Sequence, residues 1–341
     1  MTNDISRILV TGGAGYIGSH TVLCLLQKGY EVSTLDNLSN GSIESLSRIQ
    51  SITGKSVENY EIDITDKISV SKIFKENSFD AIIHFAGLKA VGRSVIDPFS
   101  YYQNNVVGSL VLLEQAIINK VKKFIFSSSA TVYGRDAVPP YLESMPKGIT
   151  TNPYGSSKAM IERILEDLSL VNSDVSFNIL RYFNPIGAHS SGLIGEDPLG
   201  ESDNLMPFIL QVAVGEKDVL SVFGGDYDTP DGTCRRDYLH VMDLAEGHVS
   251  ALSKDNEPGC FIYNLGTGVP ISVLEIVNTF ESVTGITIPY KIVNRRKGDL
   301  AEFWADPKKA NIELDWRASR SLNDMISDAW NWQSKNPSGY K

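Results

Sequence analysis

A glycine-rich turn close to the start of the chain places the strongest constraint on its fold. The apolar run Ile5–Thr11 is typical of a short buried strand, and residues 16–28 have the pattern of a helix. The glycines fit two templates, GxGxxG at positions 13, 15 and 18 and GxxGxxG at positions 12, 15 and 18. In both templates the backbone approaches a pyrophosphate, and the N–H groups at the start of the helix point toward it. The sequence therefore predicts a dinucleotide site that includes Gly12, Gly15 and Gly18.

Two aspartates stand where the next two predicted strands end. Asp36 closes the strand Glu31–Asp36, about 20 residues after the glycine turn, which is the usual place for a carboxylate that binds a ribose 2′-hydroxyl. A carboxylate there would repel a 2′-phosphate, so the sequence favours NAD over NADP. Asp63 follows the predicted strand Val57–Ile62 and has two interpretations, a contact with the adenine or an N-cap for the next helix.

Strand and helix patterns alternate through the first half of the chain. Further strands are predicted at 81–85, 123–128 and 175–180, and further helices at 67–76, 104–119 and 153–171. The helix at 104–119 is apolar nearly all round, which predicts burial, and Asn104 at its start would then need hydrogen-bonding partners. This βαβα order predicts an α/β fold built on a Rossmann-type, doubly wound parallel sheet.

The alternation loosens after about residue 183, where Gly, Pro and Asp become frequent. We therefore expect an NAD-binding Rossmann domain at residues 1–183 and a smaller, C-terminal mixed α/β region that binds the substrate at residues 184–341. The boundary is soft, because the chain can cross between the two parts more than once.

A tyrosine and a lysine at positions i and i+4 predict a proton-transfer site. Tyr154 and Lys158 lie near the start of the predicted helix 153–171 and would share one of its faces. The ordinary pKa of tyrosine is about 10, and a nearby ammonium group and a cationic nicotinamide would both lower it. Ser127–Thr131, at the end of a predicted strand, offers hydroxyl groups that can hydrogen-bond a reacting oxygen. Together with the dinucleotide site, this pattern indicates hydride transfer to a bound nicotinamide.

The composition disfavours several other kinds of partner and site. The formal net charge of −10 argues against nucleic acid, because phosphate backbones are bound by clustered Lys and Arg. The sequence has no run of 18 apolar residues that would predict a membrane span, and no signal-peptide pattern. Three widely spaced cysteines without a CxxC pair predict no metal site and no disulfide, and Cys24, within an apolar run, is expected to pack in the core. We therefore expect a cytoplasmic protein.

Four longer segments carry a resemblance to a known family. They are residues 84–92 (HFAGLKAVG), 127–134 (SSSATVYG), 180–185 (LRYFNP) and 240–244 (HVMDL). Together with the glycine turn and the YxxxK pattern, they resemble the UDP-glucose 4-epimerases, which belong to the extended short-chain dehydrogenases/reductases. The similarity runs from residue 8 to residue 332.

The resemblance implies a reaction that these residues can support. It is the interconversion of UDP-glucose and UDP-galactose in galactose metabolism, with tightly bound NAD. Tyr154 would take the proton of the sugar 4-hydroxyl, and Ser129 would hydrogen-bond that oxygen, while hydride passes from sugar C4 to NAD. The 4-keto sugar would then turn over and receive hydride on its other face. Lys158 would tune Tyr154 and hold the nicotinamide ribose.

The resemblance also implies two sets of binding residues. Those expected to contact NAD are Gly12, Gly15, Tyr16, Ile17, Gly18, Asp36, Asn37, Asn40, Asp63, Ile64, Phe85, Ala86, Gly87, Lys89, Asn104, Tyr154, Lys158 and Phe183. Those expected to hold the UDP-sugar are Ser129, Tyr154, Asn184, Asn204, Leu205, Phe223, Arg236, Arg296, Asp299 and Phe303. The chemistry of the side chains agrees with this assignment for Arg236 and Arg296, because each guanidinium group can offer paired donors to a diphosphate.

Two further expectations follow from the family. Phe303 stands where several relatives have tyrosine, and a small residue here admits N-acetylated sugars, so Phe303 predicts a preference for UDP-glucose and UDP-galactose. Relatives pair through helices that match residues 98–118 and 153–171, which implies a homodimer. The apolar runs in these helices would equally suit burial within one chain.

Three other functions compete with this one. A sugar-nucleotide 4,6-dehydratase would be expected to have Thr-Asp-Glu in the place of Ser129-Ala130-Thr131. A 4-ketosugar reductase would release its cofactor and often uses NADPH, which Asp36 disfavours. A non-catalytic dinucleotide sensor can lose the tyrosine or the lysine, whereas this chain has both.

Overall fold

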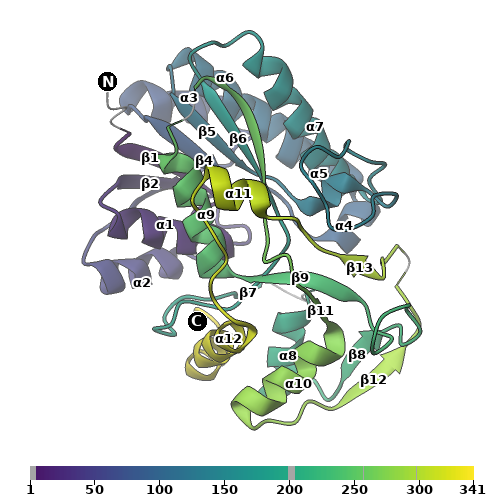
Figure 1. The fold of residues 1–341 in the computed structure, drawn as a ribbon. Helices are drawn as coiled ribbons and strands as arrows, with labels where there is room; N and C mark the ends of the chain where they lie inside the picture. The colour runs from purple at the N-terminus through teal and green to yellow at the C-terminus, as the bar shows by residue number, and fades with distance from the viewer. Residues whose placement is uncertain (1–4, 199–203, 256, 297) are drawn as a thin grey trace.

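A seven-stranded parallel sheet forms the centre of the larger of two lobes (Figure 1). The computed structural model describes residues 5–198, 204–255, 257–296 and 298–341. The strand order is β10-β6-β5-β4-β1-β2-β3, and every neighbouring pair is parallel. From β1 the chain builds outward to β3 and then returns to build β4, β5 and β6 on the other side, which confirms the doubly wound fold. The strands are β1 (Arg7–Thr11), β2 (Glu31–Leu35), β3 (Glu58–Tyr60), β4 (Ala81–His84), β5 (Lys123–Ser127), β6 (Ser176–Tyr182) and β10 (Gly259–Leu265).

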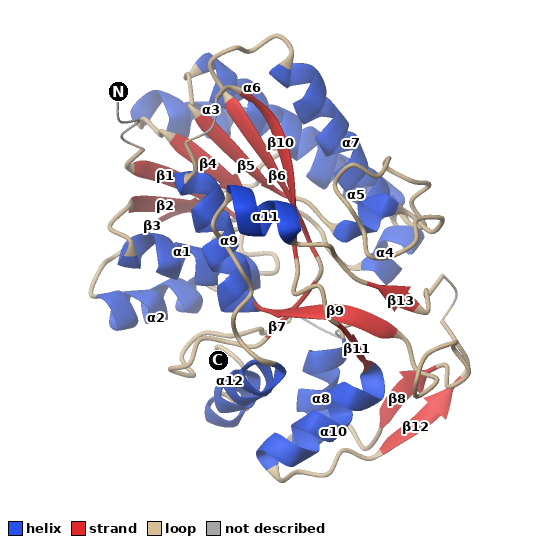
Figure 2. Ribbon diagram, in the orientation of Figure 1, coloured by secondary structure: helices blue, strands red, loops and turns tan. Residues whose placement is uncertain are grey.

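Both faces of this sheet are apolar because helices cover both (Figure 2). Along β1, Ile8 and Val10 join one cluster of buried side chains and Leu9 joins another, as the alternation along a strand requires. The first face is covered by α1 (Tyr16–Gln27), α2 (Ile43–Thr53), α9 (Val241–Ser253) and α11 (Lys308–Glu313). The second is covered by α3 (Lys67–Glu76), α6 (Gly108–Ile118) and α7 (Pro153–Ser169). The short helices α4 (Val91–Ile96) and α5 (Pro98–Tyr101) and the wide π-helical turn η1 (Tyr102–Val107) pack against α7.

Several of these helices begin at residues that cap them. Asn152 Oδ1 accepts a hydrogen bond from Gly155 N at 2.9 Å, and Pro153 takes the first position of α7, where its missing N–H costs nothing. Asp66 caps α3 in the same way, so that helix begins and ends at the predicted residues. A cap of this kind contributes about 1 kcal/mol to stability.

The smaller lobe has a core of its own. Four short strands form one sheet, in which β9 (Arg235–His240) pairs with β7 (Asn184–Ile186), β11 (Pro270–Ser272) and β13 (Glu302–Phe303). A second pair joins β8 (Leu220–Phe223) to β12 (Tyr290–Val293). Helices α8 (Leu205–Ala213), α10 (Val273–Thr284) and α12 (Leu322–Lys335) complete a separate apolar cluster with these strands.

The chain crosses between the lobes more than once. After β9, helix α9 packs against α1 in the larger lobe, and β10 pairs with β6 at the edge of the large sheet. The chain then returns to the smaller lobe through β11 and α10. Helix α9 and strand β10 therefore lie in the larger lobe although they follow the predicted boundary at residue 183. The division of functions at that boundary is a proposal.

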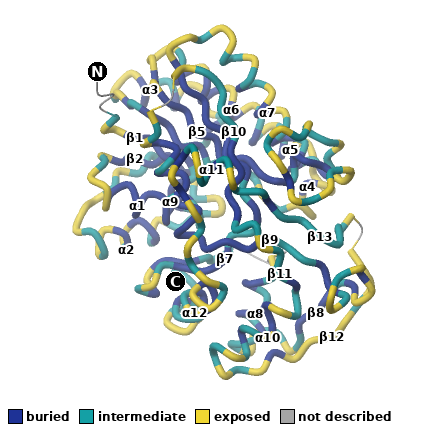
Figure 3. Tube along the Cα trace, viewed as in Figure 1, coloured by how far each residue is buried: buried dark blue, intermediate teal, exposed yellow. Residues whose placement is uncertain are grey.

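The prediction that the helix at 104–119 is buried all round is wrong. It consists of η1 and α6, and Val107, Leu110 and Ile118 are 38%, 44% and 64% exposed. Met160, which belongs to the apolar stripe of α7, is 47% exposed. The reason is that the sheet covers only one side of this helix layer, as the burial colours show (Figure 3).

The structure can be examined for the membrane spans, metal sites and disulfides that the composition disfavoured. Among the described residues, no helix has the length and apolar character needed to cross a membrane. In the same part of the chain, no group of three or more His, Cys, Asp or Glu could hold a metal ion. Cys24, Cys234 and Cys260 are all free thiols, and Cys24 is buried in the core as predicted.

Candidate active site

The glycine turn lies at the point where the strand order of the large sheet reverses. β1 and β4 are neighbours there, and their carboxyl ends lie at the edge of the sheet where such folds bind ligands. Gly12 has a φ of +70°, and a Cβ at this position would lie 2.7 Å from the Ala86 backbone nitrogen. A Cβ on Gly18 would lie 2.1 Å from the Gly12 carbonyl oxygen. Only glycine allows this close packing of the loops after β1 and β4 and of α1 against the turn.

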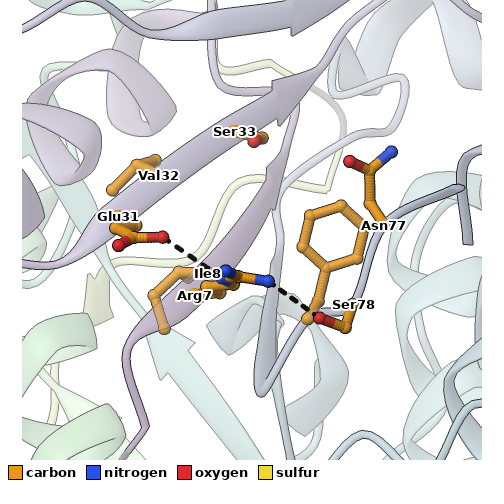
Figure 4. Close-up of a pocket in the computed structure, with 8 residues that line it drawn as sticks. Arg7, Ile8, Glu31, Val32, Ser33, Asn77 and Ser78 are labelled. Atoms are coloured by element: carbon orange, nitrogen blue, oxygen red, sulfur yellow. Dashed lines mark hydrogen bonds and ion pairs between the residues drawn. The ribbon is translucent and has the colours of Figure 1, made fainter.

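A separate cavity of about 300 Å³ lies at the opposite edge of the sheet (Figure 4). It is lined by the amino ends of β1 and β2 and by residues 77–79. Its charged groups already bond to each other, because Arg7 pairs with Glu31 at 3.2 Å and donates to Ser78 Oγ at 3.0 Å. None of the predicted site residues lines this cavity, so it plays no part in the site.

The two predicted aspartates are placed differently at the carboxyl edge. Asp36 is 7% exposed, and its two oxygens accept hydrogen bonds from Ala14 N at 3.0 Å and Leu38 N at 2.9 Å. Burial raises the pKa of Asp36, although these two hydrogen bonds oppose the change. Asp63 accepts from Asn37 Nδ2 at 2.8 Å. Because the next helix is capped by Asp66, the interpretation of Asp63 as its N-cap is wrong.

The three predicted catalytic residues come together between β5 and α7. Tyr154 and Lys158 lie on the buried side of α7 and are 6% and 5% exposed. Lys158 Nζ donates to the Ser127 carbonyl oxygen at 2.8 Å and lies 5.9 Å from the centroid of the Tyr154 ring. Ser129 is the N-cap of the short helix η2 (Ala130–Tyr133), and the interaction of its side chain with Tyr154 acts to lower the pKa of that tyrosine. The end of β5 and the first two turns of α7 therefore place all three functional groups at one point.

Burial shifts the pKa values of both Tyr154 and Lys158. It raises the pKa of Tyr154 above its ordinary value, while hydrogen bonds with Ser129 and Tyr182 oppose the change. Burial lowers the pKa of Lys158 to about 8, while the negative charge of Glu162 acts to raise it. The ammonium group of Lys158 therefore does not by itself make the tyrosine a base near pH 7. The second positive charge expected from the sequence, that of the nicotinamide, is required as well.

The loop after β4 is held by the asparagine that follows the predicted one. Asn105 is 1% exposed, accepts from Leu88 N at 2.7 Å, and donates to Leu88 O and to Ser157 Oγ, both at 3.0 Å. Asn104 is only half-buried, and no described residue hydrogen-bonds its side chain. The prediction of a buried Asn104 is therefore wrong, because the wide turn η1 interrupts the ordinary helical spacing and Asn105 takes the inner position.

Four residues predicted to hold the UDP-sugar meet in the smaller lobe. The guanidinium carbon of Arg296 lies 4.5 Å from the centroid of the Phe223 ring. Asp299 lies between two arginines, with its oxygens 3.6 Å from Arg296 Nε and 3.8 Å from Arg236 Nη2. This cluster provides two guanidinium groups next to an aromatic ring, which suits a diphosphate attached to a planar base.

Phe303 belongs to an aromatic group at the junction of the lobes. Its ring centroid lies 4.9 Å from that of Tyr141 and 5.3 Å from that of Phe183. Strand β13 brings Phe303 beside Arg236 of β9. The ring therefore stands between the aromatic residues of the larger lobe and the arginine cluster of the smaller one.

Glu196 connects predicted contact residues from both lobes. Its carboxylate lies 3.3 Å from Lys89 Nζ and accepts from Asn204 Nδ2 at 3.4 Å. Tyr16, in the first turn of α1, donates its hydroxyl hydrogen to the Gly187 carbonyl oxygen at 2.6 Å. Burial and the charge of Glu196 raise the pKa of Tyr16 well above its ordinary value.

The remaining predicted residues differ in exposure. Ile64 is 4% exposed and packs so closely on Gly108 that a Cβ there would lie 2.5 Å from its Cδ1. Others are half-buried, namely Ile17, Phe85, Ala86, Asn184 and Leu205, whereas Asn37, Asn40 and Gly87 are exposed.

Comparison with known proteins identifies the family. The NAD dependent epimerase/dehydratase family matches residues 8–266. A UDP-glucose 4-epimerase from Yersinia enterocolitica is 58% identical over 98% of this chain and 99% of its own length, and one from Bacillus subtilis is 56% identical over 98% of each. The crystal structure of UDP-glucose 4-epimerase from Bifidobacterium longum in complex with NAD⁺ and UDP has a TM-score of 0.95 and 51% identity, covering 98% of this chain and all of that one. This chain belongs to the UDP-glucose 4-epimerase family.

Members of the UDP-glucose 4-epimerase family differ in the sugars named for them. A solved UDP-Glc/GlcNAc 4-epimerase from Campylobacter jejuni has a TM-score of 0.84 and 37% identity to this chain, covering 97% of it and 99% of its own length. The fold alone therefore does not decide which sugar an epimerase of this family accepts.

Sequence reasoning missed three residues at this epimerase site. Tyr182, at the end of β6, interacts with Tyr154 and acts to lower the pKa of that catalytic candidate. Asn105 holds the loop after β4, and Glu196 joins Lys89 to Asn204. The signal for Tyr182 was its place in the segment LRYFNP after a predicted strand. Glu196 had no local signal, because its partner Lys89 lies 107 residues away in the sequence.

Proposed function

We propose that this protein interconverts UDP-glucose and UDP-galactose by reversible hydride transfer at sugar C4 to retained NAD, through a 4-keto intermediate. The observation that carries the proposal is the convergence of Tyr154, Lys158 and Ser129 at the carboxyl end of β5, on the same edge of the sheet as the glycine turn. The relatives named UDP-glucose 4-epimerase support it, since they match nearly the full length of the chain.

The residues at the carboxyl edge fit NAD. Each oxygen of Asp36 accepts one backbone N–H and keeps a lone pair with which to accept a ribose hydroxyl. The N-cap of helix α1 is Gly15, which has no side chain to bond the first N–H groups of the helix, so these groups can bind the pyrophosphate. When bound there, NAD supplies a reversible hydride acceptor for sugar C4. Lys158, Asn104 and Phe183 would contact its nicotinamide end.

Tyr154 then moves the proton. Its hydroxyl would remove the proton of the sugar 4-hydroxyl and later return it, and Ser129 would hydrogen-bond the same oxygen. Lys158 would contribute positive charge near the Tyr154 ring. Since one tyrosine both takes and returns the proton, no second acid or base is needed.

The smaller lobe would anchor the nucleotide while the 4-keto sugar turns over. Arg236 and Arg296 would hold the diphosphate and Phe223 would stack on uracil. Asn184, Asn204, Leu205 and Asp299 would complete the contacts. Phe303 would restrict the space beside the sugar, which favours UDP-glucose and UDP-galactose over their N-acetylated counterparts.

We also propose that two copies pair through the helix layer of α5, α6 and α7. Supporting this, apolar side chains on or beside it are exposed, with Phe99 at 77%, Leu110 at 44% and Met160 at 47%. Analytical ultracentrifugation should give a dimer for the natural chain and a smaller species for Leu110→Arg. The three free cysteines fit the cytoplasmic location that we propose.

Proton NMR of the purified protein with UDP-galactose and no added cofactor tests the proposed function. Appearance of UDP-glucose, approaching a fixed ratio, is the expected result. No conversion, even with added NAD, would overturn it. Net oxidation or reduction with released cofactor would indicate the 4-ketosugar reductase instead.

A further inference from the structure

A buried carboxylate lies next to the proposed catalytic residues without being one of them. Glu162 is fully buried, on α7 one turn after Lys158. Its Oε1 accepts hydrogen bonds from Ser128 Oγ at 2.6 Å and from Arg181 Nε at 3.0 Å, and its Oε2 accepts from Arg181 Nη2 at 2.7 Å. Arg181, on β6, is 1% exposed. The three hydrogen bonds fix this carboxyl group against Ser128 and Arg181 inside the core.

This one carboxylate joins the three segments that carry the reacting groups. Tyr154, Lys158 and Glu162 follow one another at intervals of four residues along α7 and therefore share its buried face. Ser128 directly precedes Ser129, and Arg181 directly precedes Tyr182. The Ser128–Glu162–Arg181 triad therefore sets the distance between α7, the end of β5 and the end of β6.

Stability alone does not explain such a triad. Removing two charges from water costs several kcal/mol per ion, and well-packed apolar residues of similar volume often give equal or greater stability. The guanidinium is further fixed by the Tyr133 ring, whose centroid lies 4.7 Å from it. Tyr133 in turn donates to Asn264 Oδ1 on β10 at 2.6 Å. The arrangement fixes the position of Arg181 on several sides.

Glu162 also acts on the charge of Lys158. Burial lowers the pKa of Lys158 to about 8, and Glu162 opposes this. Other charged or titratable groups face Lys158 and Glu162 from α7 itself and from the helices, strands and loops that pack against it. They are Tyr154 and Glu166 on α7, His84 on β4, Arg181 and Tyr182 on β6, Tyr133 on η2, Cys260 on β10 and Lys147 in the segment before α7.

We propose that Glu162 is a positioning residue for the epimerase reaction: through Ser128 and Arg181 it holds Ser129 and Tyr182 against Tyr154, and through its charge it supports Lys158. This inference rests on the proposed function and goes beyond it, because Glu162 touches neither sugar nor cofactor in that proposal. It predicts that loosening the triad lowers kcat more than it changes KM.

Ser128→Ala is the decisive variant, because it removes one hydrogen bond and leaves no buried charge unpaired. We expect kcat to fall about tenfold at saturating UDP-galactose, with KM nearly unchanged, because small misplacements of reacting groups are costly. Ser169→Ala is the matched control, because it also removes one hydrogen bond of a serine hydroxyl. Ser169 is the last residue of α7 and donates to the Glu166 carbonyl oxygen at 2.7 Å, far along the helix from the triad, so wild-type kcat is expected.

A second variant tests the role of the charge. Glu162→Gln would leave Arg181 unpaired and can unfold the protein, so the double variant Glu162→Leu, Arg181→Met replaces the pair with apolar residues. Without the carboxylate, Lys158 loses its proton more easily. The fall of kcat at high pH should therefore begin at lower pH than in the natural chain, by about half a pH unit or more.

The outcomes separate this inference from the proposed function. Natural protein that fails to convert UDP-galactose overturns the function itself. Active natural protein, together with Ser128→Ala and double variants that fold by circular dichroism and keep wild-type kcat and pH profile, overturns the inference alone. A lowered kcat with a shifted profile in the double variant, and neither in Ser169→Ala, supports it.

Discussion

The two halves of the proposed site are built on different physical principles. Tyr154, Lys158 and Ser129 are 5–7% exposed and are fixed by a long helix and the central sheet. The Arg296 and Asp299 side chains, in contrast, are 50% and 26% exposed and lie on a connecting segment of the smaller lobe. The comparison teaches that the proton-transfer half is formed by the core of the fold. The anion-binding half consists of ion pairs that a ligand must partly replace.

The largest effect should come from removing the Tyr154 hydroxyl. Tyr154→Phe should lower kcat by about 10²–10⁴-fold, the usual contribution of a positioned acid or base, while bound NAD content stays the same. Tyr30→Phe is the control, because Tyr30 bonds Ser253 far from the carboxyl edge. NMR of UDP-galactose conversion measures both, and a fully active Tyr154→Phe would refute the proton-transfer assignment.

Removing a guanidinium from the anion-binding half should have a different kinetic signature. Arg236→Ala should raise KM for UDP-galactose about 10–100-fold and change kcat little, since the diphosphate is bound alike in ground and transition states. Arg7→Ala, at the opposite edge of the sheet, should leave both constants unchanged. If Arg236→Ala lowered kcat alone, the contrast between the two halves would be wrong.

The pH profile sharpens the contrast further. Burial lowers the pKa of Lys158 to about 8, so the lysine is charged below that pH and neutral above it. Because its positive charge supports Tyr154, we expect kcat to fall up to about tenfold as the pH rises from 7 to 9. Saturating UDP-galactose isolates this effect from binding. A kcat that stays constant or rises to pH 9 would contradict it.

The smallest effect is expected from substitution of Phe303, which lies at the junction of the two halves of the site. Phe303→Ala would open the space beside Phe183 and Tyr141, and we expect kcat/KM for UDP-N-acetylglucosamine to rise about tenfold. Activity on UDP-glucose in the same variant serves as the internal control and should change only a few-fold. Unchanged discrimination would remove Phe303 from the specificity determinants.

The sequence predicted features that depend on short-range patterns. The glycine turn, the strand–helix alternation and the i, i+4 spacing of Tyr154 and Lys158 all involve residues close together in the chain. It failed where a local irregularity changed the spacing, as with Asn104 and Asn105 in η1. It also missed Glu196 and the pairing of β10 with β6, because nothing local specifies a contact across about 100 residues.

The return of the chain to the large sheet makes the two lobes mutually dependent. A fragment that ends at residue 183 would lack β10 and α9, so the whole length of β6 would become an open edge with unpaired N–H and C=O groups. Such edges invite pairing with other chains. Transfer of residues 1–183 alone is therefore expected to give an aggregating fragment. Segments of the smaller lobe lie on both sides of β10 in the chain, so changes in that lobe must leave β10 in place on the large sheet.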